Sequence, residues 1–225
     1  MVVGSFDAVN GHNDDPDLDA ALNAAISGDQ NGFAVLWRTL QPPILRYLRV
    51  VVGAAAEDVA SETWLQAARD LRNFTGGSTA FRVWLFRIAR NRGMDERRRA
   101  GRRREDSREP SDQSLGGLPV PDAAADVLEK WGTDWALGLI ATLPPDQAEA
   151  VMLRVVAGLA VAQVAEVLGK RPGAVRVASM RGLRQLARHP DVRARATWGG
   201  TVDGRDADGG DTVDDAPDDG TSEGV

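Results

Sequence analysis

EVLGKRPGAVRVASMRGLRQLAR, residues 166–188, is the stretch that decides the fold of the C-terminal half of the chain. Small and aliphatic residues before Gly169 predict a short helix, and glycine suits the left-handed position that ends one. Pro172 fits the first turn of a second helix, and Pro190 stops it. The segment 159–188 therefore predicts a helix-turn-helix.

The second of these helices has two different faces at helical spacing. One face, predicted to pack inward, carries Val175, Ser179, Gly182, Leu183 and Leu186. The other face carries Arg176, Met180 and Arg184, with Val177 and Arg181 beside them. Guanidinium groups bind phosphates and the edge of guanine, so this face favours insertion into a DNA major groove. A solvated charged face is the alternative, and these residues alone leave it open.

Charge is segregated along the 225-residue chain, although its formal net charge is only -6. Residues 81–108 hold eleven arginines against four acids, and 169–195 hold eight bases against one acid. The two ends are acidic: residues 1–19 have five acids and no base, and 199–225 have nine acids and one arginine. Two basic blocks on an acidic chain indicate a polyanionic partner for those blocks.

Several classes of protein are disfavoured by composition. The chain has no cysteine, which excludes disulfides and thiolate zinc sites, and only two histidines, His12 and His189. The sequence LGKRPG has arginine where a P-loop needs Ser or Thr. We therefore expect no active site, no metal and no cofactor. No apolar run reaches the ~18 residues of a membrane span, and the first residues do not resemble a signal peptide, so we expect a cytoplasmic protein without membrane insertion.

Helical periodicity without strand-like alternation predicts an all-α fold of two helical domains joined by a flexible linker. The predicted order is a disordered acidic arm at 1–18, a helical bundle at 19–104, a linker at 105–125, a helix-turn-helix domain at 126–192, and a disordered acidic tail at 193–225.

Two local features of the first bundle carry further expectations. Pro42 and Pro43 predict a boundary between two helices. In the helix predicted from about residue 55 to 71, Trp64, Leu65 and Ala68 are expected to form the apolar face.

The helix predicted over residues 81–99 combines aromatic side chains with arginines. Phe74, Phe81, Trp84 and Phe86 interleave with several arginines, after a glycine-containing loop. Aromatic faces beside cations are typical of surfaces that bind unstacked bases and single strands. The alternative is that Trp84 or Phe86 belongs to the core.

Three segments together resemble the extracytoplasmic-function (ECF) sigma factors of bacterial RNA polymerase. They are AEDVASETWLQAARDL (56–71), FRVWLFRIARNRGMDERRR (81–99) and the run from LPPDQ at 143 to RQL at 186. The resemblance covers about 25–100 and 126–190. It implies a region-two domain and a region-four domain with no region three between them. It also implies a transcription initiation factor that binds core polymerase, directs it to promoters and assists melting, and that is not an enzyme.

The resemblance assigns roles to named residues. Asp58, Ser61 and Glu62 correspond to the helix that docks on the clamp helices of the largest polymerase subunit. The residues that the resemblance assigns to contact with the minus-ten element are the loop residues Phe74, Thr75, Gly76, Gly77 and Ser78, and Arg82, Trp84, Arg87, Arg90 and Asn91 on the following helix. The minus-thirty-five element corresponds to Arg171, Pro172, Gly173, Ala174, Arg176, Val177, Met180, Arg181 and Arg184.

The resemblance implies three partners. They are promoter DNA, core polymerase and an anti-sigma factor, and the contacts on core polymerase are the clamp helices of the largest subunit and the flap of the second-largest subunit. Two alternatives stay open. One is a helix-turn-helix regulator that binds operators without polymerase, which leaves the block at 55–99 unexplained. The other is a nucleic-acid-modifying enzyme, which the lack of a nucleophile, metal cluster or placed histidine disfavours.

Overall fold

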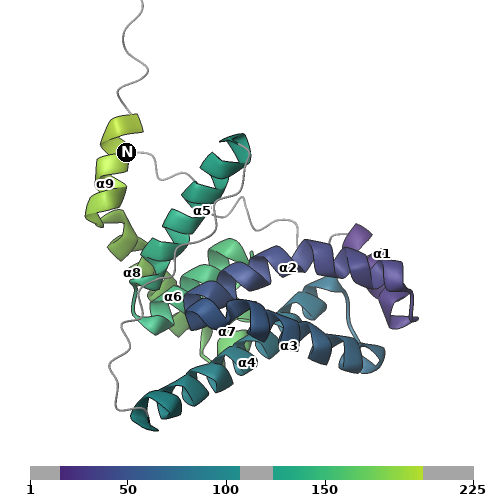
Figure 1. The fold of residues 1–225 in the computed structure, drawn as a ribbon. Coiled ribbons are helices and arrows are strands. Elements are labelled where there is room, and N and C mark those ends of the chain that lie inside the picture. The colour runs from purple at the N-terminus through teal and green to yellow at the C-terminus, as the bar shows by residue number, and fades with distance from the viewer. Residues whose placement is uncertain (1–15, 107–123, 200–225) are drawn as a thin grey trace, which may run out of the picture. The chain divides into compact units, whose positions relative to one another are not determined.

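The computed structural model describes residues 16–106 and 124–199, and every element in these ranges is helical (Figure 1). The predicted all-α fold class is confirmed. The greater part of the predicted acidic arm, linker and acidic tail lies outside the described residues, at 1–15, 107–123 and 200–225. At the inner edges of these segments the described helices run further than predicted, because α1 begins at Pro16 and α4 continues to Asp106.

The first half of the chain forms four helices with two short 3-10 turns. They are α1 Pro16–Ile26, α2 Gln30–Val52, a turn at Gly53–Ala55, α3 Ala56–Asp70, a turn at Leu71–Asn73, and α4 Ser78–Asp106. Asp29 caps α2 by accepting a hydrogen bond from the Asn31 amide at 2.8 Å. Gly53 ends α2 at a positive φ of 62°.

The prediction of a helix boundary at Pro42 and Pro43 is wrong, because α2 continues through both. Each proline removes one backbone donor from the helix interior. Leu40 and Ile44, on either side of the pair, are both buried at 1% exposure or less. Packing of this apolar face holds α2 continuous against the local preference, as tertiary contacts supply most helical stability in proteins.

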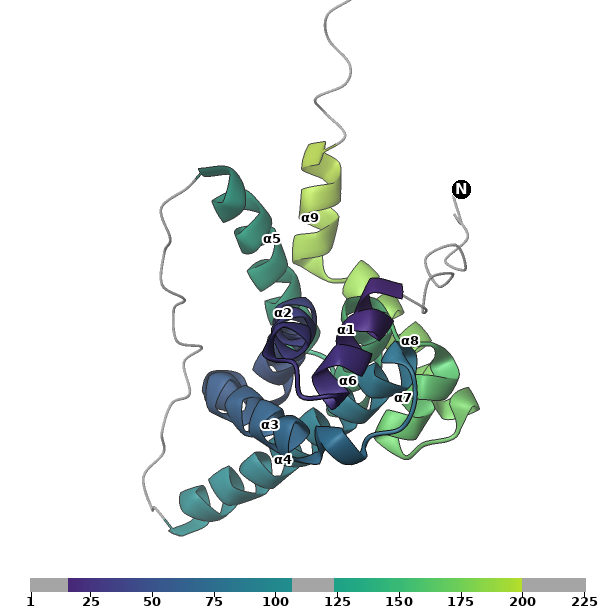
Figure 2. The same ribbon diagram turned by 90° about the vertical axis from the view of Figure 1, so that its right-hand side faces the viewer.

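The core of these helices forms where their apolar stripes meet. Leu22, Leu36, Tyr47 and Phe86 are fully buried, and α3 packs along α4 (Figure 2). The rings of Tyr47 and Phe86 meet edge to face with centroids 5.8 Å apart. This packing fixes α4, and with it the predicted strand-binding side chains.

The inner face of α3 differs by one position from the prediction. Trp64 is buried as expected, but Ala68 is exposed and its neighbour Ala67 is fully buried in its place. Leu65 is 57% exposed. The core takes Thr63 instead, whose hydroxyl donates to the Val59 carbonyl at 2.7 Å and so enters the interior satisfied.

The second half of the chain contains the remaining helices. They are α5 Ala124–Ala141, α6 Pro145–Val151, a π-helical turn at Met152–Val156, α7 Val161–Leu168, α8 Pro172–Ala187 and α9 Pro190–Gly199. Gly158 and Gly169 adopt positive φ angles of 67° and 63° and end the helices before them. The predicted helix, turn and helix of 159–188 is confirmed by α7 and α8.

Packing groups α1 to α8 into one unit within residues 1–187, and places α9 in a second unit within 188–225. In the first unit, buried residues of α5 and α6, such as Ile140 and Val151, belong to the same apolar cluster as Leu48 of α2. The sequence separates the two helical regions by the linker at 105–125, and apolar contacts bring their described helices together.

Candidate nucleic-acid interface

The recognition-type helix α8 is positioned by the turn that precedes it. The amide of Lys170 donates to the Ala165 carbonyl at 2.9 Å, which closes the end of α7 after Gly169. The Lys170 ammonium lies 2.7 Å from a carboxylate oxygen of Asp146, at the start of α6. The turn between α7 and α8 is therefore tied to a third helix.

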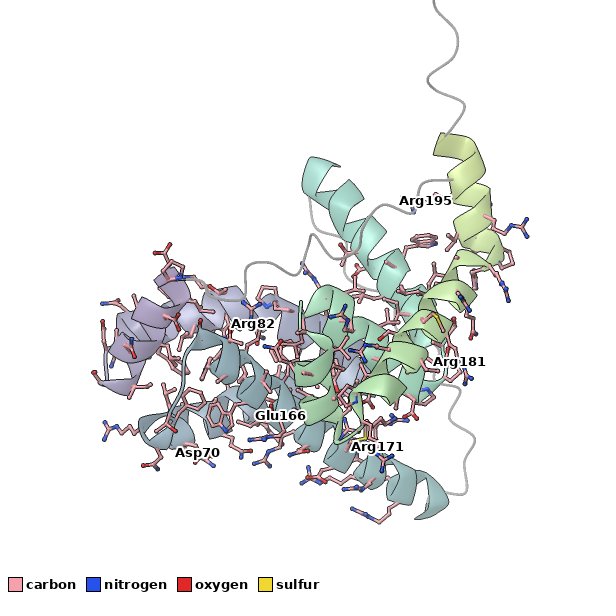
Figure 3. All side chains as sticks on the ribbon, turned by 180° about the vertical axis from the view of Figure 1, so that it is seen from behind. Asp70, Arg82, Glu166, Arg171, Arg181 and Arg195 are labelled. Carbon is pink, nitrogen blue, oxygen red and sulfur yellow. The ribbon has the colours of Figure 1, made fainter. Side chains whose placement is uncertain are left out.

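The outer face of α8 is exposed along its length. Every residue predicted to meet the minus-thirty-five element is exposed: Arg171, Pro172, Gly173, Ala174, Arg176, Val177, Met180, Arg181 and Arg184. Figure 3 labels Arg171 at the turn and Arg181 on α8. No ion pair joins Arg176, Arg181 or Arg184 to another residue within the described ranges. The face thus offers three guanidinium groups, spread across its width, that no acid in the described ranges engages, which suits a phosphate backbone.

The inner face of α8 lies very close to α6. Val175 is fully buried, and a Cβ placed on Gly182 would come within 2.8 Å of Val151 Cγ2. Only glycine permits this approach without displacement of a neighbour. Leu183, which was predicted to face inward, is 38% exposed. The helix therefore turns its glycine, and not the adjacent leucine, toward the core.

Replacing Gly182 with valine is expected to lower the free energy of unfolding by about 1–3 kcal/mol, because an overfilled contact forces its neighbours apart. The matched control is Gly138→Val in α5, where a new Cβ meets nothing within 4 Å. Urea denaturation of both variants measures the effect. Equal stability of the two would show that the contact between α8 and α6 is loose.

The loop and aromatic cluster before α4 form the second candidate surface. Phe74 lies against Phe81 and Trp84, with ring centroids 5.5 Å and 5.2 Å away. Phe81 is fully buried, whereas Phe74 and Trp84 are half-buried. The Phe81 ring therefore belongs to the core, whereas the rings of Phe74 and Trp84 reach the surface, where a base can stack on them.

The loop residues divide into exposed and buried ones. Thr75, Gly76 and Gly77 are exposed, whereas Ser78 is only 2% exposed. The Ser78 amide donates to a carboxylate oxygen of Asp19 at 2.5 Å, so a residue of α1 caps α4. Ser78 thus begins the helix, and its side chain does not reach the surface with the other loop residues.

Two arginines of α4, Arg87 and Arg90, are engaged by acids of the helix-turn-helix domain. Arg90 Nε donates to Glu149 of α6 at 2.8 Å, and the Glu149 side chain is only 7% exposed. Arg87 Nη1 lies 3.4 Å from an oxygen of Glu166 in α7, where both side chains are about half exposed or more. Asn91 is exposed. The structure brings Arg87 and Arg90 to one side of α4, facing carboxylates.

Glu149, the buried partner of Arg90, is a residue of this surface that sequence reasoning missed. It lies in the run AEAV at 148–151, where all four residues are buried. A lone acid inside a short run of buried small residues indicates a paired charge, because an unpaired buried carboxylate is costly. Its partner was not readable from the sequence, because Arg90 is 59 positions away.

Burial and the Arg90–Glu149 pair together shift the pKa values of Arg90 and Tyr47. Burial alone acts to lower the pKa of Arg90, but the hydrogen bond and negative charge of Glu149 outweigh it and raise the pKa. Burial, with a smaller contribution from Glu149, raises the pKa of Tyr47 well above its usual value. Arg90 therefore stays charged and Tyr47 neutral at ordinary pH.

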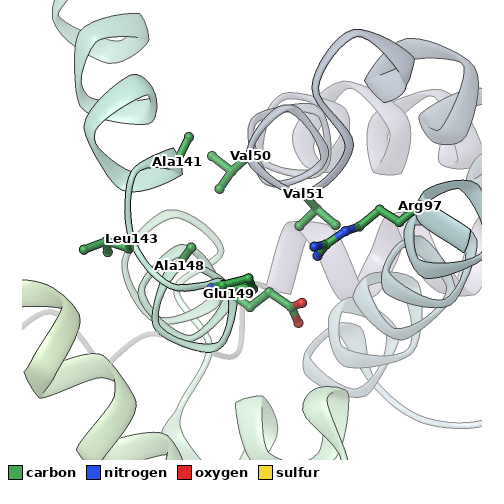
Figure 4. Close-up of a pocket in the computed structure, with 8 residues that line it drawn as sticks. Val50, Val51, Arg97, Ala141, Leu143, Ala148 and Glu149 are labelled. Atoms are coloured by element: carbon green, nitrogen blue, oxygen red, sulfur yellow. The ribbon is translucent and has the colours of Figure 1, made fainter. Parts of the chain in front are cut away.

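A small cavity of about 130 Å³ adjoins this ion pair. Val50 and Val51 of α2 line it together with Ala148, and Glu149 and Arg97 border it (Figure 4). Most of its lining residues are aliphatic, but the surface that they and the two charged residues expose to it is mostly polar. Across the described ranges, no three histidine, aspartate or glutamate side chains come together as a metal site. None of the described helices is long and apolar enough to cross a bilayer.

A third surface lies on α3. Asp58, Ser61 and Glu62 are all exposed, and the Ser61 hydroxyl donates to the Glu57 carbonyl at 2.9 Å. Glu62 lies 3.8 Å from Arg92 of α4. Leu65 follows on the same stripe, three positions after Glu62, so an exposed leucine adjoins two exposed acids. Sequence reasoning missed Leu65 by assigning it to the core.

Known protein families match the parts of the chain that carry these surfaces. The family model for sigma-70 region 2 matches residues 36–103, which contain α3 and most of α4. The model for sigma-70 region 4 matches residues 133–186, which contain α7 and all but the last residue of α8. The chain is 35% identical over 170 residues to the ECF RNA polymerase sigma factor BldN of Streptomyces coelicolor, covering 74% of this chain and 63% of that one. It is 33% identical to SigD of Mycobacterium tuberculosis, covering 75% of this chain and 82% of that one.

Solved structures share the fold. CnrH in complex with the cytosolic domain of CnrY matches with a TM-score of 0.53 and 22% identity, covering 81% of this chain and 99% of that one. The sigma factor RpoE in complex with the anti-sigma factor NepR from Bartonella quintana matches with a TM-score of 0.56 and 22% identity, covering 69% and 94%. The chain therefore belongs to the ECF family of RNA polymerase sigma factors, non-enzymatic proteins that bind core polymerase and direct it to promoters.

Proposed function

We propose that this chain recognises two separate promoter elements as part of a polymerase holoenzyme. The α8 helix reads the minus-thirty-five element as duplex DNA, and α4 with the loop at 74–78 holds the melted minus-ten strand. The observation that carries this assignment is the exposed face of α8 with Arg176, Arg181 and Arg184, on a helix that buries Val175 and Gly182 on its other side. Two linked contacts raise the effective concentration of each element at the other.

Strand binding on α4 involves an exchange of partners. Arg87 and Arg90 face carboxylates of Glu166 and Glu149. A single-stranded backbone offers phosphates to the same guanidinium groups, and half-buried Trp84 and Phe74 offer faces for unstacked bases. Binding of the melted strand therefore replaces carboxylates by phosphates at these arginines.

Core polymerase, in this proposal, contacts two parts of the chain. The stripe of Asp58, Ser61 and Glu62 docks on the clamp helices of the largest subunit, and Leu65 adds apolar contact. The region-four helices meet the flap of the second-largest subunit. We place the chain in the cytoplasm, where polymerase works, and expect an anti-sigma factor, as described for the RpoE relative.

Substituting alanine for both Glu62 and Leu65 is expected to weaken binding to core polymerase by about tenfold or more, since a few central residues dominate most interfaces. Asp70→Ala is the matched control, because Asp70 is exposed on α3 but lies about 80° or more around the helix axis from every residue of the docking stripe. Binding of labelled full-length chain to core polymerase by fluorescence anisotropy measures both. Equal affinity of the double variant and the control would contradict this docking surface.

A further inference from the structure

Two apolar side chains lie in the middle of the arginine face of α8. Val177 is 41% exposed and Met180 is 42% exposed. With about 100° of turn per residue, both fall between Arg176 and Arg181, which lie about 140° apart around the helix axis. Val177 and Met180 therefore form an apolar centre with Arg176 and Arg181 at its two edges, and Arg184 follows on the same side about one turn beyond Met180.

Val177 and Met180 take no part in packing α8 against the core. On the opposite side of α8, Val175 is fully buried and Gly182 approaches Val151. The N-terminal part of the exposed arc carries Gly173 and Ala174, which have no long side chain to hold the helix away from a ligand. The α8 sequence contains no acidic residue. A polyanion that approaches the apolar centre thus meets no acidic side chain on α8 itself.

The chemistry of the centre selects one feature of a DNA major groove. Val177 offers no hydrogen bond to a base edge, and the Met180 thioether is only a weak acceptor. The apolar group that the major groove presents is the 5-methyl of thymine. Arginines on both edges of the arc suit the phosphates of the two strands that border the groove, or a neighbouring guanine.

We propose that Val177 and Met180 read thymine methyl groups in the minus-thirty-five element, while Arg176 and Arg181 fix the helix in the groove. This inference rests on the proposed function and adds to it the base that α8 recognises, thymine. Specificity at these positions then comes from apolar contact. Each methyl group removed from water corresponds to about fourfold in affinity.

The test uses holoenzyme assembled from the full chain and core polymerase. Promoters are first selected by run-off transcription from a template library randomised across the minus-thirty-five element. Each thymine of the selected element is then replaced by deoxyuridine, which removes only the methyl group. We expect about fourfold weaker binding for each methyl that α8 contacts, and we expect the double variant V177A/M180A to bind the thymine and uracil templates equally.

Leu183→Ala is the matched control, because Leu183 is 38% exposed on the same helix but lies outside the arc between Arg176 and Arg181. This variant should keep the thymine preference of the original chain. A selected element without thymine, equal binding of thymine and uracil templates by the original chain, or an undiminished preference in V177A/M180A would each overturn the inference. A holoenzyme that transcribes no template would overturn the proposed function as well.

Discussion

Replacing Arg176 and Arg181 together with alanine is expected to weaken binding of the holoenzyme to its minus-thirty-five element by about 100-fold. Both side chains are exposed, and within the described ranges neither is held by an acid. A guanidinium contact to a base edge contributes about 1–3 kcal/mol. If both contact phosphates instead, the slope of log affinity against log salt falls by about 2. Electrophoretic mobility shift over a salt series separates these two modes.

The control for this variant removes the same charge elsewhere. Arg38 and Arg46 of α2 are exposed arginines away from α8, so R38A/R46A matches the loss of two positive charges. Long-range attraction falls equally in the two variants, whereas contact is lost in only one. Equal weakening of DNA binding by both pairs would mean that α8 supplies net charge and no specific contact.

Replacing Glu149 with alanine is expected to lower the free energy of unfolding by about 3 kcal/mol. The Glu149 side chain is 7% exposed and that of Arg90 is 23% exposed, so removal of the carboxylate leaves a mostly buried cation without its partner. Breaking a buried pair in this way is strongly destabilising, because the remaining charge keeps its desolvation cost. Urea denaturation followed by tryptophan fluorescence measures the loss.

Glu166→Ala provides the comparison, because it breaks the neighbouring pair with Arg87 at the surface. The Arg87 and Glu166 side chains are 47% and 59% exposed, so we expect a loss below about 1 kcal/mol. A similar change in both variants would show that the Arg90–Glu149 pair contributes no more than a surface pair.

The parts of the structure that the sequence predicted are those set by local chemistry. Gly169 and Pro172 determine where α7 ends and α8 begins, through the preferences of glycine and proline for particular backbone angles. Helical periodicity then determines which residues of α8 face outward, and Arg176 and Met180 are exposed as predicted. Such features depend on neighbours within one or two turns, so one sequence is enough.

The parts that it did not predict depend on contacts between distant segments. The continuity of α2 through Pro42 comes from burial of Leu40 and Ile44 against other helices. Leu65 is exposed because α3 packs on α4 with a different side of the helix. Helical periodicity predicts the buried side of α3 only to within one residue position. The pairing of Arg90 with Glu149 joins α4 to α6. Local preference contains no information on such tertiary choices.

The central claim is that the chain gives core RNA polymerase its promoter specificity. Run-off transcription tests it most directly, with core polymerase freed of other sigma factors, the full chain and a library of genomic fragments. We expect transcripts with defined start sites that depend on the chain and share a two-part upstream element. Transcripts identical to those of core polymerase alone, at concentrations of the chain that saturate core binding, would contradict the account.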